Sequence, residues 1–211
     1  MNSELGKRAI GSYFRVKEMY LLAEETSPEF KDFLQPVFEI NRGFDHLSRV
    51  MSVEFGLNED TVSESYVDDN LHKAIGHFYR AFFDIADWLS VNLRGLVIEE
   101  FRGFSHECIS QVTPEYYTDI RPRLERANQE IARIRTKKDV GNSGTVSLME
   151  QYAEIINDLR QKITDITPKK PALIDCQERC KKRFWKNWGV QIATAFFIAI
   201  TSCVLGAWLS H

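Results

Sequence analysis

The chain has 211 residues, 44% hydrophobic and 27% charged, a composition typical of a folded domain rather than a disordered chain. Its formal net charge is -3. From Lys169 onward there are 7 basic and 2 acidic residues, which leaves 20 basic and 28 acidic residues in the first 168. A phosphate backbone is held mainly by clustered Lys and Arg, so this acidic front argues against direct nucleic-acid binding.

The pattern of apolar residues is helical throughout, and alternating strand patterns bounded by hairpin turns are absent. Ser27 before Pro28, and Thr113 before Pro114, are typical helix starts, with an N-cap followed by proline at the first helical position. The sequence therefore predicts an all-α fold.

Two decapeptides nearly repeat each other, VFEINRGFDH at residues 37–46 and VIEEFRGFSH at residues 97–106. In a helix, their shared Glu, Arg and His would lie at i, i+3 and i+7 on one face, where side chains can touch. These residues are Glu39, Arg42 and His46 in the first copy, and Glu99, Arg102 and His106 in the second.

The spacing Arg-x-x-x-His resembles a shortened form of the Arg-x(4 to 6)-His motif of the HEPN ribonucleases, which are all-α domains. The resemblance implies metal-independent acid-base cleavage of RNA, with Arg42, His46, Arg102 and His106 as candidate catalytic residues. The sequence departs from that motif, because the spacing is one residue short and a glycine follows each Arg. We favour the alternative in which each row is a surface ion-pair ladder and each glycine allows close helix packing.

Residues 67–104 are apolar on more than one helical face, which predicts a helix at the centre of a bundle. Asp84, Asp87 and Arg94 interrupt this stretch, so it is not a membrane span. His72 and His77 are five residues apart and off a common face, so we expect no metal site there. No other motif indicates a cofactor or an enzyme.

Two further helices are predicted to form an antiparallel hairpin, because apolar residues recur at steps of three and four on both sides of the sequence DVGNSG. The narrow apolar stripes of these helices are typical of a short antiparallel coiled coil, in which the two helices pair either with each other or with another subunit. The stripes consist of Ile120, Leu124, Ala127, Ile131 and Ile134, then Leu148, Tyr152, Ile155, Leu159, Ile163 and Ile166. The predicted organisation is a bundle with the first hairpin arm at 1–136, a linker with the second arm at 137–167, a basic juxtamembrane linker at 168–187, and a transmembrane helix at 188–210.

Cys176 and Cys180 share a helical face, which leaves open a metal half-site, lipidation or an interchain contact. We favour two reduced thiols, because a structural zinc site needs four ligands and no histidine lies nearby in the sequence. The scattered cysteines indicate no disulfide framework.

The C-terminal region predicts a membrane anchor, because no residue from Gly189 to Leu209 is charged and a helix of that length spans roughly 30 Å. Aromatic residues at its ends and a basic N-terminal flank are typical of a span whose preceding domain lies in the cytoplasm. The aromatic ends are Trp185, Trp188 and Trp208, and the flank is Lys181, Lys182, Arg183 and Lys186. Small residues that would let spans pack together are Ala195, Ala199, Ser202 and Gly206.

In this plan the chain resembles the small membrane effectors of bacterial anti-phage systems, including retron-associated ones. The resemblance implies a tail-anchored protein of the bacterial inner membrane that disrupts the bilayer when activated, as a homo-oligomer and under the control of a protein partner or inhibitor. A passive membrane tether or adaptor is the alternative, and a membrane-bound HEPN-like ribonuclease is the second alternative.

Overall fold

A computed structural model describes residues 3–57, 63, 65–137 and 145–209, and these residues contain helices and no strands. The all-α prediction is confirmed. The chain divides into two units, one of residues 1–99 and 122–164 and one of residues 100–121 and 165–211. Side-chain exposure in the last helix is described only as far as Ser202.

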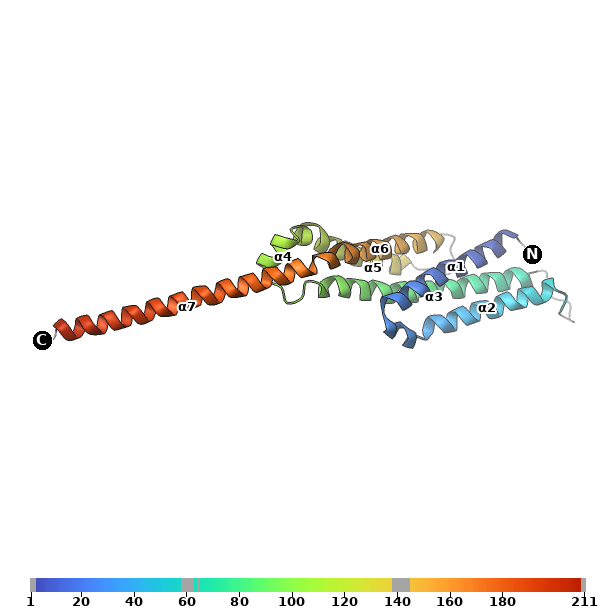
Figure 1. Cartoon of the computed structure of the whole chain (residues 1–211). Helices are drawn as coiled ribbons and strands as arrows, with labels where there is room; N and C mark the ends of the chain where they lie inside the picture. Colours follow the sequence, from blue (N-terminus) through green and yellow to red (C-terminus); the bar gives the residue numbers. More distant parts are fainter. Residues whose placement is uncertain (1–2, 58–62, 64, 138–144, 210–211) are drawn as a thin grey trace. The chain divides into compact units, whose positions relative to one another are not determined.

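The first unit is built around α3 (Tyr66–Glu99), as the two-faced apolar pattern predicts. Helices α1 (Ser3–Thr26) and α2 (Gln35–Glu54) both lie along α3 (Figure 1). Ser27 caps the short 3-10 helix Pro28–Asp32 that joins them, which confirms that helix start. The large side chains of α3 with no more than 2% exposure are Leu71, Phe78, Tyr79, Phe82, Phe83, Ile85, Leu89 and Leu93.

Both arms of the predicted helical hairpin are helices, α5 (Arg121–Lys137) and α6 (Thr145–Ile166), and Arg133 of α5 donates a hydrogen bond to Gln151 of α6 at 2.7 Å. Asp87 of α3 ties both arms to the centre, because its carboxylate accepts hydrogen bonds from Arg135 at 2.9 Å and from the Tyr152 hydroxyl at 2.6 Å. Burial and the Asp87 carboxylate raise the pKa of Tyr152. Asp87 is therefore a structural acceptor that joins α3 to α5 and α6.

The second unit contains α4 (His106–Val112), a π-helical turn (Tyr116–Ile120) and α7 (Lys170–Leu209), which follows a 3-10 turn (Thr167–Lys169). Ser105 caps α4 by accepting from the backbone N–H of Cys108. The helix start predicted at Thr113 and Pro114 is confirmed in position, because a helix begins at residue 115 and continues through the π-helical turn into α5. The predicted N-cap is wrong. Thr113 ends α4 with a backbone hydrogen bond to Ile109, and its buried hydroxyl has no hydrogen-bond partner.

The transmembrane helix predicted at 188–210 is contradicted, because none of the helices, within the residues described, is long and apolar enough to cross a bilayer. Gln191 and Thr194 place polar side chains within the apolar part of α7. The predicted tail anchor, single-pass topology and inner-membrane localisation with a cytoplasmic front all required that transmembrane helix, so they are contradicted as well.

The packing of α2 on α3 requires a glycine at position 43. A Cβ added there would lie 2.5 Å from the ring of Phe78, which is fully buried and also contacts Tyr13 and Phe44. Close helix packing is thus confirmed for the first glycine of the repeat. We expect Gly43→Ala to lower the free energy of unfolding by about 1–3 kcal/mol, through overpacking, in urea titrations followed by circular dichroism.

Gly11→Ala is the matched control, because Gly11 lies in α1 and a Cβ there meets nothing within 4 Å. This change should raise stability by about 0.5–1 kcal/mol through helix propensity alone. Equal, small stabilisation by both substitutions would contradict the close contact between Gly43 and Phe78.

Candidate functional site

The first copy of the repeat forms a polar cluster between α2 and α3. Glu39 is 3% exposed, and its carboxylate faces Arg42 at 3.1 Å, His77 at 2.8 Å and Arg80 at 2.7 Å. Arg80 also lies 2.7 Å from Nδ1 of His77, and that nitrogen can make only one of its two possible hydrogen bonds at a time. The predicted row is therefore a buried carboxylate with partners from two helices, and not a surface ladder.

The same contacts fix the charge of Glu39. Burial alone would raise the pKa of this carboxyl, but the hydrogen bonds and positive charge of Arg80 and His77 outweigh burial and hold the pKa below its ordinary value. A buried carboxylate paired on both oxygens joins two helices, because separating them leaves the charge without partners.

His46 extends this cluster, since its Nδ1 lies 2.8 Å from Oδ1 of Asn70 and its ring stacks on that of His77 at 5.3 Å. Arg42 and His46, the two candidate catalytic residues of the first copy, are thus each hydrogen-bonded to a different partner. The partners His77, Arg80 and Asn70 come from α3 and were not assigned to this cluster from the sequence. The spacing of His77 and Arg80 at i, i+3 is the pattern that could have suggested them.

The second copy of the repeat is built differently. Glu99 ends α3, Gly103 has φ +83° in the turn that follows, and His106 begins α4 and stacks on Tyr117 at 4.9 Å. The sequence Arg102-Gly103-Phe104 is therefore not helical, and its Glu, Arg and His do not form a helical row. The first copy lies within the first unit, whereas the second copy crosses the boundary between the two units at residues 99 and 100. Similar sequences therefore adopt different structures.

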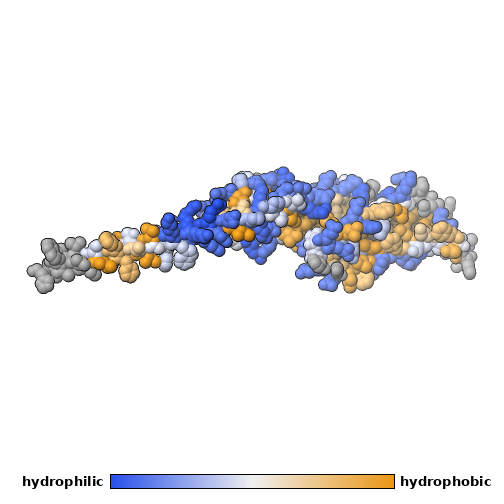
Figure 2. Space-filling model, viewed as in Figure 1, coloured by the Kyte–Doolittle hydropathy of each residue, from blue (hydrophilic) through white to orange (hydrophobic). Residues whose placement is uncertain are grey.

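An apolar groove of about 740 Å³ lies between α1 and α2, with Leu71 of α3 among its lining residues. Figure 2 shows hydrophobic side chains gathered on this part of the surface. Several of these are large and well exposed in spite of being apolar: Ile10 at 44%, Phe14 at 54%, Phe44 at 38% and Met51 at 54%. A contiguous exposed patch of this kind marks an interaction site more often than scattered single residues do.

A second apolar surface follows α7, and we call residues 184–200 the α7 apolar segment. Two of the aromatic residues predicted as membrane anchors lie in it, with Trp185 65% exposed and Trp188 49% exposed, followed by Gly189. The basic flank is exposed, with Lys181, Lys182 and Arg183 just before the segment and Lys186 within it. Ala195 and Ala199 are exposed in the segment, and Ser202 follows it. Gly206, Trp208 and Leu209 lie where the structure does not describe side chains.

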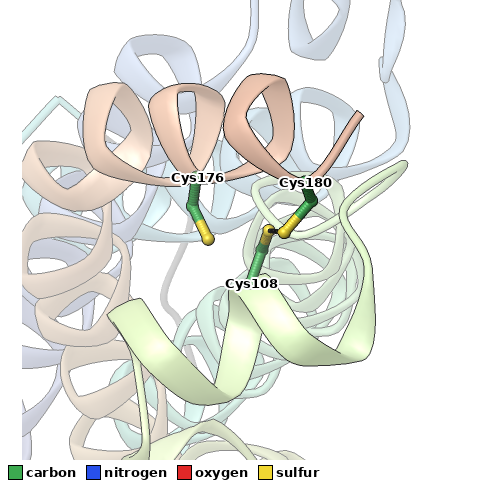
Figure 3. A group of neighbouring side chains, drawn as sticks. All are labelled: Cys108, Cys176 and Cys180. Carbon is green, nitrogen blue, oxygen red and sulfur yellow. Dashed lines mark hydrogen bonds between the residues drawn. The ribbon is translucent and has the colours of Figure 1, made fainter. Parts of the chain in front are cut away.

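Three cysteines converge in the second unit (Figure 3). Cys108 of α4 points toward Cys176 and Cys180 of α7, and the three Sγ atoms lie within 4.8 Å of one another. Cys108 and Cys180 are 3.5 Å apart, and Cys176 lies 3.3 Å from Oε1 of Gln111. From the sequence, Cys176 and Cys180 were placed on one helical face but Cys108 was not grouped with them, because Cys108 lies 68 residues before Cys176 and no local pattern connects the two.

The three thiols differ in acidity. Burial favours the neutral form of Cys108, but hydrogen bonds from Cys176, Ser105 and Cys180 outweigh burial and lower the pKa of this thiol. The hydrogen bond to Cys108, followed by burial, raises the pKa of Cys176 and raises that of Cys180 to about 11. Cys108 is therefore the sulfur at which negative charge is most stable.

No protein-family model, curated protein or solved structure matches this chain.

The polar cluster around Glu39 predicts a pH-dependent stability. A carboxyl with a folded pKa below its unfolded value stabilises the protein above the unfolded pKa of about 4.3, and that contribution is lost as the pH falls through the folded pKa. We expect Glu39→Gln to lower the free energy of unfolding by about 2–4 kcal/mol at neutral pH, and the difference from the wild type to shrink below about pH 4.

Asp45→Asn is the matched control for this measurement. Asp45 lies on the same helix, is 59% exposed and pairs with Arg49 at i, i+4, so its removal should change stability by no more than about 0.5 kcal/mol. Equal losses in the two variants, or a difference between Glu39→Gln and wild type that does not depend on pH, would show that Glu39 does not join α2 to α3.

Proposed function

We propose that this protein is a self-assembling interaction module, in which the α7 apolar segment of one copy binds in the groove between α1 and α2 of a second copy. The observation that carries the proposal is the exposure of both surfaces. The segment has nine large apolar side chains that are between 41% and 69% exposed. They are Phe184, Trp185, Trp188, Val190, Ile192, Phe196, Phe197, Ile198 and Ile200.

The groove is long enough to hold about two turns of the α7 apolar segment. The groove is lined from Gly6 to Phe14 on α1, which corresponds to about 12 Å, or slightly more than two helical turns. Binding of a helix, through its apolar side chains, in a groove of a partner is a common mode of recognition. Gly11 lines the groove without a side chain, and a Cβ there would meet nothing within 4 Å, so a partner helix can approach closely.

The charges of the two regions are also complementary. The first 168 residues, which contain the whole of the first unit, carry an excess of acidic groups, whereas the region from Lys169 onward is basic. Opposite charges accelerate association and favour a defined orientation. The basic residues that precede the α7 apolar segment would therefore favour its approach to the acidic unit of another copy.

A contact between two different surfaces is heterologous, so it leaves one groove and one segment free at the ends of an open assembly, unless a ring closes. The function supported here is an adaptor or scaffold role exercised through protein contacts. The membrane-disrupting role required the predicted span and is not part of this proposal.

The first test compares two glycine substitutions by sedimentation velocity over a range of protein concentrations. We expect the wild type to form larger species as concentration rises, and Gly11→Leu to weaken association by about tenfold or more, because the new side chain fills the groove. Gly95→Leu is the matched control, since Gly95 is an exposed glycine of α3 with nothing within 4 Å of an added Cβ, and it does not line the groove. It should associate like the wild type.

The second test uses a labelled peptide of residues 179–202 and measures its binding to the full-length protein by fluorescence anisotropy. We expect binding to the wild type and to Gly95→Leu, and weak binding to Gly11→Leu. A monomeric wild type that does not bind the peptide would overturn the proposal. So would association that both leucine variants weaken equally. Binding of an unrelated amphipathic helix in preference to the peptide would identify another protein as the occupant and reject self-assembly.

A further inference from the structure

The three thiols of the second unit are held close together by two helices. Cys176 and Cys180 are at i and i+4 on α7 and so share one face, and Cys108 reaches them from α4. Cys108 and Cys176 are buried, at 0% and 1% exposure, and Cys180 is partly exposed. We propose that Cys108, Cys176 and Cys180 bind one zinc ion through their Sγ atoms, with water as the fourth ligand.

The sulfur positions are close to those that zinc requires. Two thiolates bound to one tetrahedral zinc at about 2.3 Å have their sulfur atoms about 3.8 Å apart. Cys108 and Cys180 are 3.5 Å apart here, and all three sulfur atoms lie within 4.8 Å of one another. Small rotations of the side chains therefore suffice for three bonds to one ion, and no movement of the helices is needed.

The accessible side of the cluster suits a solvent ligand, because Cys180 is partly exposed while the other two cysteines are not. Three protein ligands and one water form a common zinc arrangement. Gln111 lies within hydrogen-bond distance of Cys176 and would support it from the outer shell. With the thiol deprotonated, its amide must present the N–H to sulfur, an orientation that differs from the present one by a flip of the amide group.

Charge favours zinc over copper(I), the other common ion with a preference for thiolates. Three thiolates leave a net charge of -1 on a zinc site and -2 on a copper(I) site, and burial penalises the larger charge. The positive charge of Arg179 acts on Cys176, whereas the negative charge of Glu107 acts on Cys108 and Cys180. The site therefore has little surplus positive charge with which to stabilise a second negative charge. Zinc binding releases the thiol protons to solvent, with no change of oxidation state.

The test uses the full-length protein, reduced and freed of metal by a chelator. A chromogenic competitor should show one zinc ion bound per chain. Titration with Co²⁺ as a spectroscopic substitute should give d–d bands of tetrahedral intensity, together with a sulfur-to-cobalt charge-transfer band whose intensity corresponds to three thiolates.

Each of Cys108→Ser, Cys176→Ser and Cys180→Ser should weaken zinc binding by more than about 100-fold, because loss of an outer-shell partner alone costs 10- to 100-fold. Cys203→Ser is the matched control. Cys203 lies 23 residues beyond Cys180 on the same helix, about 34 Å along its axis, and cannot reach the site. Circular dichroism establishes that each variant is helical before its affinity is measured.

The cobalt spectrum of the wild type provides a test that does not depend on the variants folding. A spectrum with fewer than three thiolates, or of octahedral intensity, would overturn the proposal. So would zinc binding that Cys203→Ser weakens as much as the other three variants, tight binding of copper(I) without zinc, or a stable disulfide between Cys108 and Cys180 whose reduction does not restore zinc uptake.

Discussion

The close contact between Gly43 and the ring of Phe78 sets the spacing of α2 and α3, and the rest of the first unit depends on that spacing. It brings Glu39 near Arg80 and His77, so that a buried carboxylate has partners from the neighbouring helix. It also leaves α2 and α1 side by side on α3 with a groove between them. One missing side chain thus determines both a stabilising polar cluster and an exposed apolar surface.

The features that were predicted correctly from the sequence are those that depend on the periodic spacing of residues close together in the chain. The two-faced apolar pattern of α3 and the narrow stripes of α5 and α6 follow from positions three and four residues apart, which remain neighbours in any helix. The start at Ser27 was equally local, because its hydroxyl accepts from a backbone N–H two residues away.

The features that were missed depend on partners distant in the chain or on backbone conformation. The partners of Glu39 lie 38 and 41 residues away, and Cys108 lies 68 residues before Cys176. The repeat suggested two equivalent helical rows, but Gly103 adopts a positive φ that ends the second row. Gly103 allows a turn, whereas Gly43 allows a close contact between helices, and the sequence alone does not distinguish these two roles of glycine. The membrane span was predicted from the absence of charge over residues 189–209, whereas none of the helices, within the residues described, is long and apolar enough to cross a bilayer.

The length of α7 has a consequence for how the chain unfolds. Its 40 residues extend for about 60 Å, and its buried side chains, Leu173 and Cys176, lie in the first two turns. Beyond Arg183, which pairs with Glu107 of α4 at 3.2 Å, the described side chains are almost all exposed, so in a single copy that part of the helix is maintained mainly by its own hydrogen bonds. Helix-coil equilibria without tertiary contacts are gradual and depend on length and temperature. Heating should therefore fray this part of α7 progressively, while the bundle around α3 melts in one cooperative step, and a single midpoint would not describe the thermal denaturation of the protein.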